Sequence, residues 1–239
     1  MRDTSFPLVP LVPLVPLVPL VSHSPLPMTQ TVWIARHGNR LDFVNPEWFN
    51  TAKRPYDPPL SDDGLIQVQE LGKRLMREGI RHIFASPFLR TVQTANPVAE
   101  YLDLPIKIES GLSEWLNPEW MKSEPEKLPL EVLKEQFPRL DLSYTPRVIP
   151  RYPETSEQVL ERTAQTAQRL TEEFSEDILL VGHGASVVGA TWGLMGGKPE
   201  VNASLCCLVK LVRQGEQWVM ELNGDTSHLS QSEDVIRFH

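Results

Sequence analysis

Residues 31–38 read TVWIARHG, an apolar run that ends abruptly in arginine, histidine and glycine. The unbroken apolar stretch predicts a β-strand buried on both faces of a sheet. Residues 177–184 repeat the arrangement as DILLVGHG. In parallel α/β sheets the chemistry lies in the loops just past the carboxyl ends of the strands. The positions of His37 and His183, each directly after such a strand, therefore mark both as candidate site residues.

The rest of the chain alternates apolar strands with amphipathic helices. Further strands are expected at 81–86 and 106–112, and a terminal hairpin at 204–212 and 217–222. Helices are expected at 61–79, 89–101, 154–174 and 185–194, the first with Leu65, Val68, Leu71 and Leu75 facing inward. This alternation predicts an α/β fold, a three-layer α/β/α sandwich with a mostly parallel central sheet.

Two segments, 41–60 and 115–153, interrupt the alternation. Both are rich in proline and aromatic residues, and both are too long for simple connections. We interpret them as insertions that fold over the sheet edge and form a cap that shapes a substrate pocket. Peripheral packing is the alternative. Trp48, Trp115 and Trp120 suit an apolar or aromatic leaving group, or equally a place in the core.

The composition limits the partners. The 239 residues include 23 Lys plus Arg and 31 Asp plus Glu, a net charge of −8. Proteins that bind nucleic acids or anionic membranes need a positively charged surface, so neither is an expected partner of this acidic chain. An anionic substrate would need a local basic cluster. The two cysteines, Cys206 and Cys207, are neighbours, and adjacent residues on a strand rarely form a disulfide. We therefore expect a reducing compartment and a cytoplasmic location.

The N-terminal segment differs from everything that follows. Residues 7–21 read PLVPLVPLVPLVPLV, and proline at every third position is incompatible with a membrane-spanning helix. We expect residues 1–27 to be a disordered Pro-Leu-Val repeat tail and residues 28–239 to form a single domain. Met28 opens a conventional domain start, and our hypothesis is that it is the native initiator.

Basic residues surround the first histidine and recur further along the chain. Arg36 and Arg40 flank His37 in RHGNR, and their positive field would keep His37 neutral and nucleophilic and hold a phosphate dianion. In SPFLRT, at 86–91, Arg90 falls in the first turn of a helix. The helix dipole disfavours arginine there unless a bound anion neutralises it. A surface basic turn and a solvated arginine are the structural alternatives.

A carboxylate and a second histidine complete the candidate site. Glu114 precedes Trp115, and a carboxylate near a tryptophan is expected to have a raised pKa and to serve as proton donor. His183 lies between two glycines, and the backbone N–H groups of Gly184 and Ala185 at the following helix start form an anion site. A helix-start carboxylate and a bystander histidine in a tight turn are the alternatives.

Taken in order, the motifs RHG (36–38), SPFLRTVQTA (86–95), LSE (112–114) and GHG (182–184) resemble the histidine phosphatase superfamily, also called phosphoglycerate mutase-like proteins. The resemblance covers roughly residues 31–220. The ordered set is far more specific than any single motif. It implies that residues 28–239 are one histidine phosphatase domain.

The resemblance implies a two-step phosphoryl transfer. His37 attacks phosphorus and becomes a phosphohistidine, while Arg36, Arg90 and His183 hold the phosphoryl oxygens. Glu114 protonates the leaving alcohol and then activates the attacking water. The arginines supply the positive charge, so no metal and no other cofactor is implied. The partner expected is a small phosphorylated substrate, and a homodimer is left open.

Arg40 favours one branch of that superfamily. The family's mutases usually carry a serine at this position, whereas RHGNR-x-D resembles the branch of the ecdysteroid phosphate phosphatases and the phosphatase domains of T-cell signalling suppressors. In that branch the matching arginine joins the phosphate pocket, although Asn39 stands where the branch carries glutamate. The implied activity is a histidine acid phosphatase-type phosphomonoesterase acting on a metabolite or an aryl or alkyl phosphate. A phosphoglycerate-type mutase and a silent phospho-ligand binding module are the alternatives.

Overall fold

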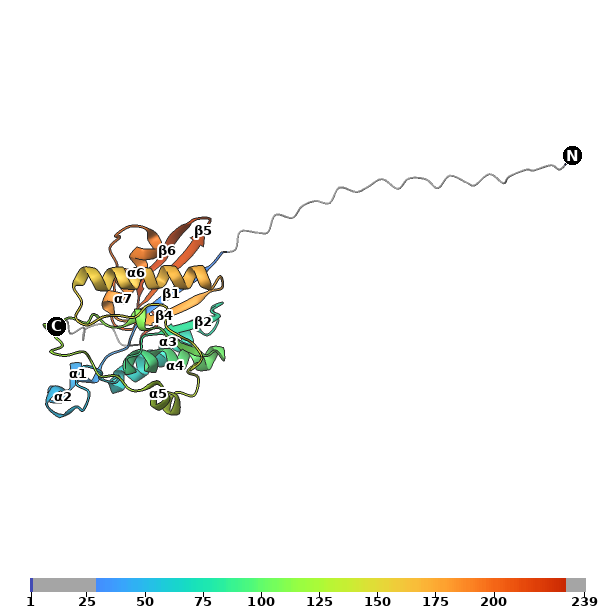
Figure 1. Ribbon diagram of the computed structural model, residues 1–239. Coiled ribbons are helices and arrows are strands. Elements are labelled where there is room, and N and C mark those ends of the chain that lie inside the picture. Colours follow the sequence, from blue (N-terminus) through green and yellow to red (C-terminus); the bar gives the residue numbers. More distant parts are fainter. Residues whose placement is uncertain (2–28, 231–239) are drawn as a thin grey trace.

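The computed structural model describes Met1 and residues 29–230. The expected tail therefore lies, apart from Met1, outside the described residues, as does Met28. A six-stranded sheet crosses the centre of the domain in the order β3-β2-β4-β1-β5-β6. Helices cover both of its faces, with α6 and α7 on one side and α3 and α4 on the other (Figure 1).

The element bounds follow the predicted alternation closely. The strands are β1 (Thr31–Arg36), β2 (His82–Ala85), β3 (Ile106–Ile108), β4 (Ile178–Gly182), β5 (Leu208–Gln214) and β6 (Gln217–Asp225). The helices are α1 (Leu41–Val44), α2 (Trp48–Thr51), α3 (Asp62–Leu75), α4 (Leu89–Leu102), α5 (Leu130–Gln136), α6 (Ser156–Glu173) and α7 (Gly184–Met195).

The sheet is mostly parallel, as predicted. β1 pairs in parallel with β4, β4 with β2, and β2 with β3, whereas β5 and β6 form an antiparallel hairpin added beside β1. The carboxyl ends of β1, β2, β3 and β4 therefore open at one edge of the sheet. Loops that carry chemistry in α/β proteins lie at this edge.

The apolar run of β1 is continuous because both faces of the sheet are buried. Val32 and Ile34 belong to the core cluster formed with α6 and α7, and Trp33 and Ala35 to the cluster formed with α3 and α4. All four are at most 1% exposed. Successive side chains of a strand point to opposite faces, so a sheet covered on both sides needs apolar residues without interruption.

The third strand ends earlier than expected, at Ile108, and a 3-10 turn (Ser110–Leu112) follows. The cause is Glu109, which is fully buried. Its carboxylate accepts a hydrogen bond from the backbone N–H of Gly111 at 2.9 Å and one from the hydroxyl of Tyr144 at 2.6 Å. The backbone N–H of Glu109 still donates to the carbonyl oxygen of Ala85 at 2.8 Å, and the chain turns away from the sheet after it.

Helix α3 is shorter than expected. It ends at Leu75 rather than near Gly79. Leu65, expected to face inward, is 44% exposed, whereas Val68 and Leu71 are buried in the core. The spacing of three of the four leucine and valine positions identified the buried face, and Leu65 lies beside that face.

The two cysteines also lie elsewhere than expected. Cys206 and Cys207 are in the turn before β5, not on a strand, and both are buried. Cys206 adopts a left-handed backbone conformation with φ of 54°. Its backbone N–H donates to the carbonyl oxygen of His37 at 3.0 Å, so this turn packs directly behind the first motif.

The two insertions differ in what they contact. In the first, a bridge between Arg40 and Leu60 closes the base, and the short helices α1 and α2 lie between. In the second, α5 packs through its buried Leu133 against the core on the α3 and α4 side. Peripheral packing is therefore the role of α5, and other parts of both insertions reach the pocket described below.

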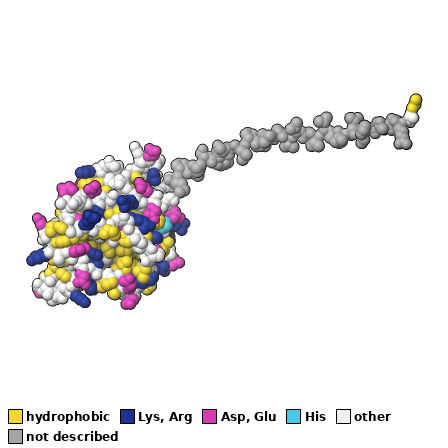
Figure 2. All heavy atoms as spheres, viewed as in Figure 1, with side chains coloured by type: hydrophobic (Ala, Val, Ile, Leu, Met, Phe, Trp, Pro, Cys, Tyr) yellow, Lys and Arg dark blue, Asp and Glu magenta, His cyan; other side chains and the backbone are white. Residues whose placement is uncertain are grey.

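Within residues 29–230, no helix combines the length and the apolar character needed to cross a bilayer. On the face seen in Figure 2, acidic and basic side chains are interspersed with apolar ones rather than gathered by sign. Nucleic acid binding requires a concentrated positive field, and this face does not present one. The absence of nucleic acid and membrane partners stays a prediction.

Close packing of α6 against α7 is testable at Gly189. A Cβ atom there would lie 1.9 Å from the Thr163 hydroxyl oxygen and 2.7 Å from the carbonyl oxygen of Leu160. We expect Gly189→Ala to lower the free energy of unfolding by about 1–3 kcal/mol through overpacking, measured by urea denaturation. Gly197→Ala, which meets nothing within 4 Å in the described structure, is the matched control. Equal stability of the two variants would contradict the packing.

Candidate active site

His37 directly follows β1, and its side chain is fully buried. Its Nδ1 lies 2.7 Å from the carbonyl oxygen of Gly38, so Nδ1 carries the proton and donates it to that oxygen. The tautomer leaves a lone pair on Nε2. That atom has no hydrogen-bond partner within the described residues. A neutral imidazole with an unpaired Nε2 is a nucleophile ready for use.

The surroundings hold His37 in this neutral state. Burial is the main cause of a pKa well below the ordinary value, and the positive charges of Arg90, Arg36 and Arg40 and the neighbouring His183 lower it further. The prediction that a positive field keeps His37 neutral is confirmed in direction. The structure adds that desolvation is the larger effect.

Arg90 lies in the first turn of α4 and is fully buried. Its Nη2 is 3.1 Å from Oε2 of Glu114 and 3.3 Å from Nδ1 of His183. Its Nε and Nη1 have no hydrogen-bond partner in the part of the chain that the structure describes. Burial lowers the pKa of Arg90 to about 10, so it remains a cation at neutral pH. Unsatisfied guanidinium donors suit a phosphate oxygen.

Arg36 completes β1 and lines the same cavity. Its Nη1 donates to the carbonyl oxygen of Ala203 at 2.7 Å, which fixes the guanidinium. A Cβ atom placed on Gly184 would lie 3.6 Å from the Arg36 Cζ, so the guanidinium rests against the start of α7. Gly184 and Ala185 also line the cavity, and their helix start favours an anion, as predicted.

Arg40 lies at the cavity wall but is already paired. Its Nε and Nη2 donate to both carboxylate oxygens of Asp42, at 2.9 and 2.5 Å. The guanidinium also stacks on the Phe43 ring at 4.4 Å from its centroid. Its Nη1 remains 4.0 Å from Oε2 of Glu114. Asp42 is the aspartate of the RHGNR-x-D pattern, but its position at the site and its pairing with Arg40 were not predicted from the sequence.

His183 joins Glu114 to Ser86. Its Nδ1 lies 3.2 Å from Oε2 of Glu114, and its Nε2 lies 2.9 Å from the Ser86 hydroxyl oxygen. Burial, aided by the charge of Arg90, lowers the pKa of His183 to about 4. The neutral imidazole therefore donates from Nδ1 to the carboxylate and accepts from Ser86 at Nε2. Ser86 was missed, although it opens the SPFLRT stretch.

The expected raised pKa of Glu114 is wrong in direction. Its neighbour Trp115 was expected to raise the pKa of the carboxyl. Burial does raise it, but His183, which donates a hydrogen bond, and the charges of Arg90 and Arg40 outweigh burial, and the pKa falls well below its ordinary value. The indole of Trp115 does not desolvate the carboxylate enough to compete with these cations.

Arg162 on α6 fixes the backbone that carries Glu114. Its guanidinium donates to the carbonyl oxygens of Gly111 at 2.8 Å and Glu114 at 3.2 Å. It also forms a buried two-point ion pair with Glu154 at 2.6 and 2.8 Å. Arg162 was missed in the sequence, because arginine is usually solvated, although its spacing from Val159 and Thr166 places it on the buried face of α6.

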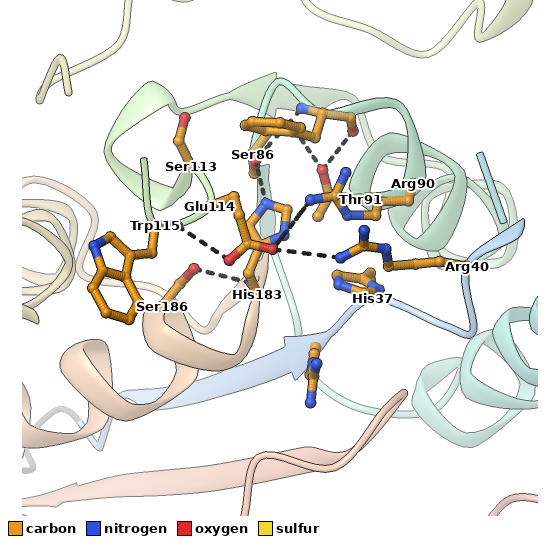
Figure 3. A network of polar contacts seen from close by, with 12 residues as sticks. His37, Arg40, Ser86, Arg90, Thr91, Ser113, Glu114, Trp115, His183 and Ser186 are labelled. Atoms are coloured by element: carbon orange, nitrogen blue, oxygen red, sulfur yellow. Dashed lines mark hydrogen bonds and ion pairs between the residues drawn. The ribbon is translucent and has the colours of Figure 1, made fainter. Parts of the chain in front are cut away.

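Ser186 ties the second histidine loop to the acid loop. Its hydroxyl accepts from the backbone N–H of His183 at 2.9 Å and donates to the carbonyl oxygen of Leu112 at 3.0 Å. Figure 3 shows the result: Arg40, Arg90 and His183 converge on Glu114, and His37 lies beside them. The structure thus brings all the predicted side chains together.

The site opens into a cavity of about 490 Å³. Its lining consists of Arg36, Arg40, Asp42, Phe43, Phe49, Tyr56, Arg90, Glu114, Trp115, Trp120, Met121, Gly184 and Ala185. Both insertions contribute to this lining, and the interpretation of them as a cap over a substrate pocket stays a prediction. Trp48 is not among the lining residues, and its indole N–H donates to the Pro55 carbonyl oxygen instead. Trp115 and Trp120 line the cavity as predicted, and Phe49, which is 55% exposed, lines it where Trp48 does not.

His37, Glu114 and His183 could also hold a metal ion, since their ligand atoms lie within 4.8 Å of one another. Arg90 argues against a cation there. Its Nη2 already lies 3.1 Å from the carboxylate and 3.3 Å from the His183 ring nitrogen. A guanidinium at this corner would repel a metal ion and attract an anion. The geometry favours a phosphate oxygen as the ligand.

Comparison with known proteins agrees with this geometry. Residues 32–226 match the model of the histidine phosphatase superfamily (branch 1). The match spans most of the chain, and the protein belongs to the histidine phosphatase superfamily.

Two curated proteins illustrate which members of the superfamily this chain is similar to. Ubiquitin-associated and SH3 domain-containing protein A of Mus musculus is 34% identical over 221 residues, covering 76% of this chain and 35% of the relative. The ecdysteroid-phosphate phosphatase of Drosophila melanogaster is 28% identical over 207 residues, covering 71% of this chain and 27% of the relative. The chain spans about a third of the length of these curated relatives.

Solved structures share the fold. The ecdysone phosphate phosphatase of the silkworm Bombyx mori, solved in complex with tungstate, aligns with a TM-score of 0.70 at 23% identity over 88% of this chain and 98% of the other. A phosphoglycerate mutase from Bacillus anthracis aligns with a TM-score of 0.58 at 20% identity, covering 84% of this chain and 95% of the other. The expected resemblance to the ecdysteroid phosphate phosphatase branch is confirmed.

The buried histidines predict how stability depends on pH. The unfolded chain protonates each histidine near pH 6.5, whereas folded His183 does so only near pH 4 and folded His37 well below its ordinary pKa. The unfolded state thus binds more protons between these values. We expect the free energy of unfolding to rise with pH across pH 4–6.5, by about 1 kcal/mol per pH unit for each histidine. Urea denaturation of wild type and His37→Gln measures this, and an equal slope in both would contradict it.

Proposed function

We propose that this protein is a metal-independent phosphomonoesterase that works through a phosphohistidine at His37. The observation that carries the proposal is the unpaired Nε2 of a neutral, buried His37 beside guanidinium groups with unused donors. Such groups bind a phosphate and stabilise the charge that shifts during its transfer. Membership of the histidine phosphatase superfamily supports the same reaction class.

In the first step, Nε2 of His37 forms a bond to phosphorus, and the bond from phosphorus to the leaving alcohol oxygen breaks. Arg36, Arg90 and His183 bind the three equatorial oxygens. The leaving oxygen takes a proton from Glu114. In the second step, Glu114 takes a proton from water, the water oxygen bonds to phosphorus, and Nε2 recovers its lone pair.

The low pKa of Glu114 in the free protein is compatible with this role. A phosphate ester brings negative charge into contact with Arg90 and His183, which now hold Glu114 ionised. Once these groups bind phosphate oxygens, their effect on Glu114 weakens and the phosphate charge opposes ionisation. The carboxyl then takes up a proton in the enzyme–substrate complex, where it is needed.

Arg40 serves as a further phosphate ligand in this proposal. Its Nη1 is the part of the guanidinium that Asp42 leaves available, and the side chain lines the cavity. A mutase of the phosphoglycerate type is the weaker alternative, because Arg40 stands where the family's mutases carry serine. A silent binding module is weaker still, because every residue of the proposed reaction is present and assembled.

The substrate class follows from the cavity walls. The cavity lining also includes five aromatic side chains, which supports an aryl or apolar alkyl phosphate: Phe43, Phe49, Tyr56, Trp115 and Trp120. Several similar proteins are phosphatases by name, including one for ecdysteroid phosphate. We expect a small phosphorylated substrate as partner and a cytoplasmic location. A homodimer stays open.

Turnover and trapping test the proposed function directly. With excess EDTA present, wild type is expected to hydrolyse p-nitrophenyl phosphate. Rapid quenching with a ³²P-labelled substrate is expected to leave acid-labile, alkali-stable label on wild type and none on His37→Ala. The label has these properties because a phosphoramidate bond to histidine is hydrolysed in acid and survives base.

Each other outcome points to a different function. Activity that EDTA abolishes would contradict metal independence. Phosphoryl exchange between 3-phosphoglycerate and a bisphosphate primer, faster than hydrolysis, would favour a mutase. A protein without label or turnover across a panel of phosphorylated metabolites, yet able to bind phosphate, would be the silent module.

Leaving-group dependence tests Glu114 as the proton donor. Glu114→Gln is expected to lower kcat/KM for an alkyl phosphate by about 10²–10⁴-fold, because a poor leaving group needs the proton. With p-nitrophenyl phosphate, whose leaving group needs little protonation, the loss should be clearly smaller. Steady-state kinetics on matched esters measures the ratio. Equal losses for both esters would exclude Glu114 as the acid.

A further inference from the structure

Asp57 is a buried acid that the proposed reaction does not use. It lies in the first insertion, and its side chain is 1% exposed. Its Oδ1 accepts a hydrogen bond from the backbone N–H of Leu89 at 2.8 Å and lies 3.8 Å from Nη1 of Arg90. Its Oδ2 has no hydrogen-bond partner among the described residues. A buried, unsatisfied carboxylate oxygen needs a reason beyond packing.

The reason lies in the charge balance of Arg90. This buried guanidinium stands between two carboxylates, with Glu114 at 3.1 Å from Nη2 and Asp57 at 3.8 Å from Nη1. A buried cation without a counter-charge is strongly unfavourable. The two carboxylates differ, because Glu114 gains and loses a proton in every proposed cycle, whereas Asp57 is absent from the cavity lining.

We propose that Asp57 is a positioning residue for Arg90. Its carboxylate keeps the guanidinium oriented and charge-balanced during the part of the cycle in which Glu114 is protonated. The inference rests on the proposed phosphatase function and extends it, since it names the group that holds the phosphate-binding arginine in place. Asp57 acts through Arg90 and touches neither the substrate nor the reacting atoms.

Other charges around Asp57 agree with this role. Arg90 of α4, Arg54 of the first insertion and Lys127 of the second all act on its carboxyl. Burial raises the pKa of Asp57, and these three cations oppose the rise. Lys127 also lies 5.5 Å from the centroid of the Phe88 ring, and Arg90 lies 4.7 Å from it. Cations from both insertions and from α4 therefore act on the Asp57 carboxyl.

A purely structural role is separable from the charge. Asp57 caps the start of α4 by accepting from Leu89, and an asparagine oxygen can accept the same hydrogen bond. Asp57→Asn therefore keeps the cap and the shape but removes the charge that faces Arg90. Asp62→Asn is the matched control, because Asp62 is an exposed acid in the first turn of α3.

The experiment measures inorganic phosphate binding by calorimetry, kcat and KM for matched aryl and alkyl phosphates across pH, and Tm. We expect Asp57→Asn to retain the Tm of wild type within a few degrees and to bind phosphate about 10-fold more weakly, with kcat/KM reduced by about 10–100-fold. Both effects have one cause: without Asp57 the guanidinium turns toward Glu114 and away from the phosphate position. Arg90 then holds Glu114 ionised more strongly, so the alkaline limb of kcat for the alkyl ester should move to lower pH.

A double-mutant cycle shows whether the effect passes through Arg90. In an Arg90→Gln background, Asp57→Asn should cause no further loss of phosphate affinity. The same loss in both backgrounds, or wild-type affinity and pH profile in Asp57→Asn, would overturn the proposal. If Asp57→Asn does not fold, Asp57→Ser replaces it, because a serine hydroxyl can accept from the Leu89 N–H but carries no charge, and a folded serine variant with wild-type phosphate affinity and pH profile would equally overturn the proposal.

The two proposals fail differently. Wild type that neither turns over phosphate esters nor forms a phosphohistidine overturns the proposed function. Wild type that does both, with Asp57→Asn indistinguishable from it, overturns only the role of Asp57. Phosphate affinity is measured without turnover, so it reports on the pair of Asp57 and Arg90 in either case.

Discussion

Arg90 places a positive charge in the interior of the protein, and the rest of the site is arranged around that charge. It contacts Glu114 directly, approaches His183 and faces Asp57 on its far side. Its charge also helps to keep the imidazole of His37 neutral. A fully buried guanidinium is expensive to desolvate and is tolerated only with counter-charges close by. The positions of the two carboxylates follow from that need.

The same arrangement prepares the site for an anion. Donors on Arg36 and Arg90 are left without partners in the described structure, and Nε2 of His37 is left without one beside them. Because folding already holds these groups in place, little reorganisation would be needed for a phosphate to bind in the way that we propose. The neutral histidines and the ionised Glu114 are the state of the site before charge enters it. The low pKa of both histidines makes the folded state less stable in acid.

The fold explains why distant residues meet. Each strand end at one edge of the sheet carries one part of the site, and further contacts lock the loops together. Ser186 links the His183 loop to Leu112, and Arg162 holds the backbone on both sides of that residue. The loops therefore keep one relative position, as a site that binds a small tetrahedral anion requires.

The motifs were readable because they are local. A buried apolar strand followed by His37 or His183 predicts both the sheet and the edge of it where chemistry occurs. Arg36 ends β1, and Arg90 and Glu114 follow β2 and β3 at the same edge. The lowered pKa of Glu114, opposite to the expected rise, could not be predicted from the sequence. It depends on which charges lie within a few ångströms, and spacing along the chain does not report that distance.

The sequence by itself determined the alternation of strands and helices, the two-sided burial of the sheet and the positions of His37 and His183 directly after two buried strands, since each depends on neighbouring residues. Tertiary structure alone decided the partners of those residues. Asp57, Ser86 and Arg162 reach the site from separate elements, at sequence separations that no local pattern encodes. Long-range electrostatics and hydrogen bonding then set the protonation states, because burial and charge act through space rather than along the chain.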